Sequence, residues 1–503
     1  MPLTQLKVAL PFALVALALE GAPAHADSYE GMPLGGRTAA MGKTGIARGN
    51  DSAMPFLNPA GLALLESSTA SLSANVYAVT VVSVPHYSGA TSELDPGNGG
   101  TFAYQLNQQG VQSIAVDTLP TSFAGMLHIQ QGDTRHIFAA TLAVPRVINR
   151  SFTENADLKG PGLAVRRSST AKASLHQYDI GISYARNFGS KLRAGITTLG
   201  AFTLDERQDT GDKLFVQGAA VFQRSLSSTI VSAYSFDVGV TAGLQLDLAE
   251  DFSIGLAVRG PSIHAKGHAD VTHSEGSYSN SSSPLLPTGL TSVRKTGDRV
   301  DGFPLRVGGG AFYRVTAKLS VAIDANLYLP RDGERQRNLV VSTAAIPPTL
   351  ESQGDAQKVV ERTPLRAVVN GSLGVEYALK GAWLRGGLFT DFADQTPVEE
   401  GDPSQRTLRF PWNHYGFTFG YATQIGPVES TFGLLASYGQ GKTIRAPLLP
   451  VESPVTAAQP ELTDGAALHT MVFLNGSIDS NAERQKAKAV LEESNKKQSE
   501  PLK

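Results

Sequence analysis

The sequence contains few residue patterns that support covalent or phosphate chemistry. It has 503 residues and no cysteine, which excludes disulfides, thiolate catalysis and thiolate metal sites. It contains neither a Gly-x-Ser-x-Gly elbow nor a His-Glu-x-x-His motif. Gly42-Lys43-Thr44 matches the end of a phosphate-binding loop, but Gly36 lies one residue too far upstream and no strand precedes it. We therefore expect no enzyme activity and no cofactor.

Charge and histidine content also limit the possible functions. The net charge is −2, so the composition gives no reason to expect a nucleic-acid partner. The chain has ten scattered histidines, of which His264, His268 and His273 lie close together in the sequence. Such a group is able to bind a metal weakly, but we interpret it as part of a solvated loop and expect no metal site.

The side chains best suited to binding are arginines and aromatic residues. They lie in segments where apolar and polar residues alternate, at the positions expected to point inward. They are Arg259, Arg306, Arg385, Phe312, Trp383 and Phe389. An arginine can hold a carboxylate through paired hydrogen bonds, and large apolar groups beside glycines such as Gly308, Gly310 and Gly387 suggest a pocket for an apolar ligand. Two other interpretations stay open: the aromatic side chains pack on a plug, and the arginines pair with acidic neighbours.

These candidate residues lie on segments in which apolar and polar residues alternate. From Phe236 to Leu248, every even position is apolar, whereas most odd positions are polar or glycine. An extended chain with this pattern exposes one face to hydrocarbon and the other to water. The pattern recurs in segments of ten or more residues, which is long enough for a tilted strand to cross a bilayer. The sequence therefore predicts an all-β fold, a transmembrane antiparallel β-barrel.

Fourteen segments carry the alternation, and short and long connections follow one another between them. The segments are 68–82, 119–130, 134–146, 174–187, 190–204, 233–248, 251–262, 303–315, 317–330, 364–378, 381–393, 411–424, 427–440 and 467–477. Short inner turns and long outer loops are typical of bacterial barrels. We expect the long connections, among them 147–173 and 205–232, to be loops, with the strand-like segment from Lys213 to Gln223 forming a loop hairpin or, alternatively, part of the barrel. The stretch from Ser274 to Ser283 is expected to be exposed and mobile because it is too polar to bury much apolar surface.

The N-terminus resembles a secretory signal peptide. Lys7 precedes an apolar run from Val8 to Leu19, and Ala24-His25-Ala26 supplies the small residues of a cleavage site. We expect residues 1–26 to be the signal peptide and residues 66–478 to form the barrel. Residues 479–503 are predicted to be a charged periplasmic tail, a possible binding segment for a periplasmic protein partner. Export of a chain with alternating strands points to the outer membrane and its lipids.

Residues 27–65 do not alternate and are rich in small residues. The Gly35-Gly36 stretch, the region of Asp51 and Asn58-Pro59-Ala60-Gly61-Leu62 resemble the N-terminal hatch of the FadL/TodX family of outer-membrane transport proteins. Two late segments, from Val369 to Tyr377 and from Leu384 to Gly387, resemble the C-terminal half of that family. The resemblance implies fourteen strands with a hatch inside the barrel, and hatch residues Gly35, Gly36, Asn58, Pro59, Ala60 and Gly61.

The resemblance also implies a function. Family members import long-chain fatty acids or aromatic hydrocarbons passively, so we expect a channel for a hydrophobic ligand such as a long-chain fatty acid. We expect the hatch around Asn58–Gly61 to shift, and Pro145 to mark a break in the wall because proline removes a ladder donor. The alternatives are an aromatic-hydrocarbon channel, a non-transporting barrel that acts as a structural or secretion partner, and a general porin.

Overall fold

A computed structural model describes residues 32–85, 88–89, 105–107, 111–160, 163–217, 220–279, 286–330, 334–346, 359–362, 366–393, 412–444, 446–447 and 462–479. The expected signal peptide, the first five residues of the expected hatch and the expected tail after Asp479 lie outside these ranges. Within the described part of the chain, no helix is long and apolar enough to cross a membrane.

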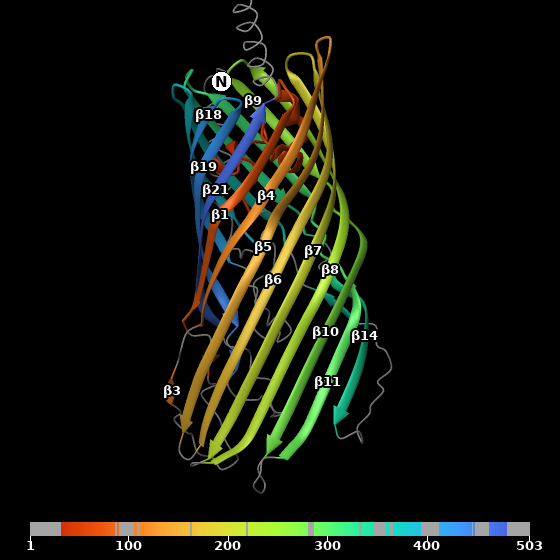
Figure 1. The fold of residues 1–503 in the computed structure, drawn as a ribbon, viewed down its shortest axis with the longest axis vertical. Coiled ribbons are helices and arrows are strands. Elements are labelled where there is room, and N and C mark those ends of the chain that lie inside the picture. Colours follow the sequence, from red (N-terminus) through yellow and green to blue (C-terminus); the bar gives the residue numbers. More distant parts are fainter. Residues whose placement is uncertain are drawn as a thin grey trace, which may run out of the picture.

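Fourteen antiparallel strands form a closed ring (Figure 1). In order around the ring they are β1 (Thr69–Val84), β4 (Val111–Gln131), β5 (Thr134–Gly160), β6 (Leu163–Phe188), β7 (Leu192–Gln217), β8 (Ala220–Ala249), β9 (Phe252–Arg259), β12 (Arg306–Arg314), β13 (Leu319–Tyr328), β16 (Val368–Ala378), β17 (Ala382–Asp391), β18 (Asn413–Ile425), β19 (Val428–Ile444) and β21 (Leu462–Asp479). Each pairs with its neighbours, and β1 pairs with β21 to close the ring. The predicted fourteen-stranded barrel is confirmed.

Short turns join the strands at one end of the barrel, as the sequence predicts. Four of these turns contain a glycine with φ between 59° and 75°, namely Gly132, Gly189, Gly381 and Gly426. This left-handed region suits glycine because it has no Cβ to clash with the backbone. We call this end of the barrel the turn end and the opposite end the hairpin end.

The predicted long loops at 147–173 and 205–232 are wrong, because these residues are largely strand. The strands β5 to β8 contain 26 to 30 residues each and pair along the whole of two hairpins, β5–β6 and β7–β8. Figure 1 shows these strands continuing well past the rest of the ring toward the hairpin end. The polar side chains in these stretches do not prevent strand formation, since each backbone group has a ladder partner on the neighbouring strand.

Within the described residues, seven further strands lie outside the ring. They are β2 (Ser88–Gly89), β3 (Gln105–Asn107), β10 (Ile263–Ser279), β11 (Leu286–Arg299), β14 (Glu334–Ile346), β15 (Val359–Arg362) and β20 (Ala446–Pro447). Strand β10 pairs with β8 on one side and β11 on the other. The expectation of a mobile loop is therefore wrong for Ser274–Ser279, and the three neighbouring histidines also lie on this strand. We call the part of β5–β8, β10 and β11 beyond the ring the extension.

The ring has an apolar outside and a polar inside. Outward side chains such as Ile180 and Ile182 are 60% and 72% exposed, whereas the inward Thr197, Thr241 and Gln245 are fully buried. The aromatic row Tyr415, Phe417, Phe419 and Tyr421 lies on the outer face. This inversion of the usual arrangement fits a surface that contacts lipid, where a closed ring also satisfies every strand backbone group.

Among the residues that the structure describes, three short helices lie inside the turn end of the barrel. They are α2 (Arg37–Ala40), α3 (Met54–Leu57) and the 3₁₀ helix η1 (Pro59–Leu64), seen in red within the ring in Figure 1. Their side chains are almost all buried, and η1 packs against β6, β7 and β8 while α2 packs against β17, β18 and β19. We call residues 32–65 the hatch, since they fill the lumen at this level.

Candidate functional site: a cavity between hatch and wall

Glycines on the inward face of the wall let the hatch backbone approach closely. A Cβ on Gly387 would lie 2.3 Å from the nitrogen of Gly42, and one on Gly310 would lie 3.1 Å from the nitrogen of Ala47. The space beside Gly308 is likewise occupied, by Ile46. The room that these inward glycines leave is therefore filled by the hatch, and a ligand pocket must be found elsewhere in the lumen.

The Asn-Pro-Ala element fixes the hatch to strands β8 and β9. The fully buried Asn58 donates from Nδ2 to the carbonyl oxygens of Ile46, Leu244 and Leu256 at 2.7, 3.1 and 3.4 Å. Its Oδ1 accepts a hydrogen bond of 3.1 Å from the nitrogen of Ala60 and so caps η1. Asn58 therefore connects two hatch segments to the wall, while Pro59 and Gly61 are buried beside it.

Two wall residues on other strands hold the middle of the hatch. Asp324 on β13 accepts from the nitrogens of Gly45 and Ile46 at 2.6 and 2.9 Å. Thr418 on β18 accepts from the nitrogen of Gly42 at 2.8 Å and donates to the oxygen of Ala40 at 2.9 Å. The backbone groups of the hatch, which forms no sheet, thus obtain their partners from the barrel.

Near its start the hatch is shaped by Gly35 and Gly36. Gly35 has φ of 72°, and the Asp51 carboxylate lies against it and accepts from the nitrogen and Oγ1 of Thr38 at 2.7 and 2.9 Å. Gly36 lies against the side chain of Asn475 on β21. Glycine is needed at both places because any Cβ would meet a neighbouring side chain.

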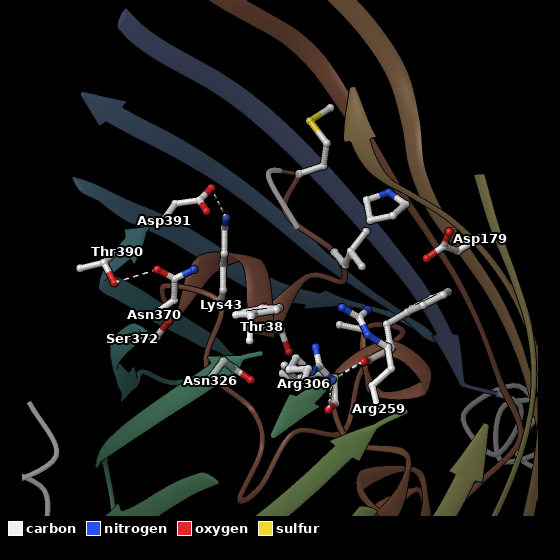
Figure 2. A pocket seen from close by; sticks show the side chains of 17 residues that line it. Thr38, Lys43, Asp179, Arg259, Arg306, Asn326, Asn370, Ser372, Thr390 and Asp391 are labelled. Carbon is white, nitrogen blue, oxygen red and sulfur yellow. Dashed lines mark hydrogen bonds and ion pairs between the residues drawn. The ribbon is translucent and has the colours of Figure 1, made fainter. Parts of the chain in front are cut away.

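A cavity of about 60 Å³ lies between the hatch and the wall on the side facing the hairpin end (Figure 2). One part of its lining is apolar and comes mainly from the hatch, and the rest is polar and comes mainly from the wall. The apolar residues are Met32, Leu34, Ala53, Phe56, Leu57 and Pro145, and the polar ones include Lys43, Asp179, Arg259, Arg306, Asn326, Asn370 and Asp391. The volume holds a few water molecules, so a larger ligand requires the hatch to move.

The predicted binding arginines have different surroundings. Arg259 and Arg306 both line the cavity and are buried. Arg306 donates to the carbonyl oxygens of Phe56 and Leu57 at 2.7 and 2.8 Å, so it also holds the hatch. The guanidinium of Arg259 lies 4.9 Å from the centre of the Phe303 ring. Figure 2 shows the two arginines side by side at one edge of the cavity.

Arg385 lies apart from the cavity in an ion-pair network. Its Nε donates to Glu376 at 2.8 Å, and its other nitrogens donate to Glu429 at 3.1 Å. Glu376 also accepts from Arg37 of the hatch at 3.0 and 3.1 Å. This network matches the interpretation that a lumen arginine pairs with acidic neighbours.

The three predicted aromatic residues all point inward, but none is among the residues that line the cavity. Phe312 is buried against Met41 and Ala47 of the hatch. Phe389 is buried in a second cluster with hatch residues, and Lys43 lies 4.5 Å from its ring centre. Trp383 is half-buried next to Arg385, 5.7 Å from its guanidinium. The contacts of Phe312 and Phe389 match the interpretation that the aromatic side chains pack on a plug, whereas Trp383 contacts a wall residue.

Sequence reasoning missed several cavity residues. Asn326, Asn370 and Asp391 lie on predicted strands at inward positions. The alternation alone therefore predicts that these side chains point into the lumen. The hatch side chains Met32, Leu34 and Phe56 carry no such signal, because the hatch has no period and its path through the lumen is set by contacts with the wall.

The wall has a break next to the cavity, between β4 and β5. Their ladder ends at Ser122 and Ala143, and no further pair joins these two strands among the described residues. The register of β5 also shifts at this point, across Val144 and Pro145. Beyond the break, hydrogen bonds that involve side chains bridge the strands: Asn149 donates to Asp117 at 3.1 Å, and the Ser113 hydroxyl accepts from the backbone nitrogen of Ser151 at 3.0 Å.

The start of the hatch lies at this break. The nitrogen of Met32 donates to the carbonyl oxygen of Pro145 at 3.0 Å. On the outer side of the break, Ile114 and Val116 of β4 are 61% and 51% exposed, so the break borders an apolar outer surface. Met32 and Pro145 also line the cavity, so the cavity lies directly beside the break in the wall.

Comparison with known proteins defines the class of this fold. No protein-family model and no curated protein sequence matches the chain. Its structure is similar to that of a FadL homologue from Pseudomonas aeruginosa, with a TM-score of 0.56, 15% identity, and 91% of this chain and 100% of that chain covered. It is also similar to the toluene transporter TodX from P. putida, with a TM-score of 0.55, 12% identity, and coverages of 90% and 99%.

These similarities place the chain among fourteen-stranded barrels that enclose an N-terminal hatch. The fold is, more particularly, FadL/TodX-like, as the resemblance of the hatch and the late strands predicts.

Proposed function

We propose that the protein is a passive outer-membrane channel for hydrophobic molecules, with long-chain fatty acids as its substrate class. The observation that carries the proposal is the mixed lining of the cavity. Arg259 and Arg306 are suited to a carboxylate, and Leu34, Phe56 and Leu57 are suited to an alkyl chain. A fold shared with a FadL homologue and with a toluene transporter supports the broader part of the proposal.

The proposed route runs from the hairpin end into the cavity and leaves sideways through the break at Pro145. Straight passage toward the turn end is opposed by the many hatch anchors, especially those of Asn58 and Asp324. Movement at Met32 instead breaks one backbone hydrogen bond to Pro145, worth about 1 kcal/mol, together with the contact of its sulfur with Asn75 and the packing of its buried side chain. We therefore assign the moving part to the residues around Met32 rather than to Asn58–Gly61.

The experiment that tests this function measures uptake by liposomes that contain the purified protein. Fluorescent or radiolabelled palmitate and toluene are offered separately to wild type, to Arg259→Met and to Arg193→Met. Arg193 is a matched control, since it is also buried and inward but pairs with Asp247 at 2.6 Å and does not line the cavity. An Arg259→Met protein should lose about tenfold in palmitate uptake, the equivalent of one charge-assisted hydrogen bond of about 1.5 kcal/mol.

Toluene uptake should be unchanged in both variants because toluene has no charged group. If wild type carries toluene but no palmitate, the substrate class is aromatic hydrocarbon, which is the second candidate suggested by the TodX-like fold. If wild-type liposomes take up neither compound faster than protein-free liposomes, the proposed channel function is wrong.

A further inference from the structure

A groove lies on the outward face of the extension, away from the lumen. This face carries the ion pair of Asp212 with Arg224 at 2.8 Å and that of Asp270 with Arg294. The hydrogen bond from Arg294 lowers the pKa of Asp270, so this pair stays charged at neutral pH. Charged pairs on an outward barrel face are unfavourable in hydrocarbon, which places this surface in water beyond the lipid belt.

The same face carries a row of hydroxyl side chains in register across six strands. Cross-strand pairing links, in order, Thr153, Thr170, Thr210, Ser228, Ser274 and Ser292. Neighbouring strands lie about 4.8 Å apart, so the hydroxyls repeat at roughly the width of a sugar ring. The row therefore presents donors and acceptors at regular intervals in a polar, solvated layer.

The groove follows this row and has a volume of about 390 Å³. Its floor is open at Gly276, where an added Cβ would come 3.5 Å from Leu290 and 3.8 Å from the ring of Tyr278. Leu226 completes an apolar strip beside the hydroxyls. The acidic lining residue Asp212 is paired with Arg224, so this charge is balanced and the lining has no excess of cations to attract phosphate.

We infer that this groove binds an oligosaccharide. Sugar rings combine many hydroxyls with apolar C–H faces, and the groove offers hydroxyls in register next to an aromatic ring and two leucines. The inference rests on the proposed outer-membrane location, because an outward surface just beyond the lipid belt then faces the saccharide layer of the glycolipids around the barrel. The same chemistry would also recognise a free extracellular glycan.

The test uses the full-length protein in detergent and in liposomes. Binding of a delipidated core oligosaccharide from lipopolysaccharide is measured by saturation-transfer NMR and calorimetry. Binding to nanodiscs that contain full-core or deep-rough lipopolysaccharide is measured in parallel. The variants are Tyr278→Ala, which removes the ring, and Gly276→Val, which fills the groove with a residue that suits a strand. The matched control is Gly309→Val, at an outward glycine where an added Cβ meets nothing within 4 Å.

Wild type and Gly309→Val should bind the saccharide alike, and Gly276→Val should bind at least tenfold more weakly. Binding of free oligosaccharide identifies a soluble glycan as a sufficient ligand, whereas binding only to full-core nanodiscs identifies the membrane glycolipid. Absence of binding in every arm, or equal binding by Gly276→Val, overturns the inference. Palmitate uptake into liposomes without glycolipid is measured with the same preparations, so the failure of the channel function and the failure of the saccharide site are told apart.

Discussion

At the scale of single residues, hydrogen bonds from a few buried side chains hold the hatch in the barrel. Asn58 alone links two hatch segments and two wall strands through four hydrogen bonds. Truncating such a group removes all four bonds at once and leaves the buried nitrogen of Ala60 without its side-chain partner, which costs more than that bond itself contributes. The hatch should therefore depend on Asn58 more than on any one apolar contact around it.

Asn58→Ala is expected to loosen the hatch while the barrel stays intact. The loss is about 2–3 kcal/mol of local stability, since a buried donor of several bonds disappears. Hydrogen exchange of the amides of residues 45–61 should accelerate by a factor on the order of 30. Asn187→Ala is the control, because Asn187 makes its bonds at an exposed turn. Unchanged exchange in the Asn58 variant would show that the wall contacts alone hold the hatch.

At the scale of elements, the feature that matters for function is the break between β4 and β5. A ladder joins these strands below Ser122 and Ala143, whereas Asn149 and Asp117 meet only through their side chains above it. A chain without cysteine makes this geometry easy to test, because any disulfide that forms must be the introduced one.

The double variant Asp117→Cys with Asn149→Cys should close the break when it is oxidised. Palmitate uptake is then expected to fall to the level of protein-free liposomes and to return on reduction with dithiothreitol. Gly125→Cys with Ala140→Cys is the matched control, since these residues face each other in the intact ladder. Equal uptake by the oxidised and reduced proteins, with the disulfide verified by mass spectrometry, would exclude the break as the exit.

At the scale of the whole molecule, the barrel is a closed ring whose lumen is filled by the hatch at the turn end. The cavity between hatch and wall has a volume of only about 60 Å³, and elsewhere the described residues of the hatch pack closely against the wall, as at Gly310 and Gly387. A general porin should conduct ions steadily, whereas a barrel closed by the hatch should not. A measurement of ion conductance therefore distinguishes the porin alternative from the proposed channel.

The wild-type protein should show little or no steady conductance in planar bilayers. Deletion of residues 32–65 should produce a large, steady conductance, because the ring keeps its ladder while the lumen opens. Heat-modifiable mobility in electrophoresis checks that the deleted variant still forms the barrel. A large wild-type conductance would favour the general porin, and a silent but correctly folded deletion variant would mean that other segments close the lumen.

The alternation predicts the barrel well because it is enforced locally. Each residue on the ring contacts either lipid or the lumen, so Leu319 to Leu329 shows its phase without knowledge of the partner strand. The long extension was missed for the same reason. Outside the lipid belt both faces of a strand are in water, and a stretch such as 205–217 then lacks the apolar phase while its ladder persists.

The candidate site was predicted only in part. Arg259 and Arg306 share a phase that the sequence shows, and both reach the cavity. Arg385 shows the same phase but is paired with Glu376 on the neighbouring strand β16 and with Glu429 on β19, one strand further away. The alternation of a strand shows whether a side chain points inward or outward. It does not show where along the barrel axis the hatch ends, so it does not separate a residue that lines the cavity from one that contacts the hatch.

The seam between β1 and β21 has a consequence for the order of assembly. Asn475 on the last strand donates to Ser71 and Ser73 on the first, and it also lies against Gly36 of the hatch. Ser71 in turn bonds Ser52 of the hatch. The hatch is synthesised before every strand, yet its docking site is incomplete until the final strand joins the first. These contacts join residues about 400 positions apart in the sequence, so we expect sealing of the seam and seating of the hatch to come late in maturation.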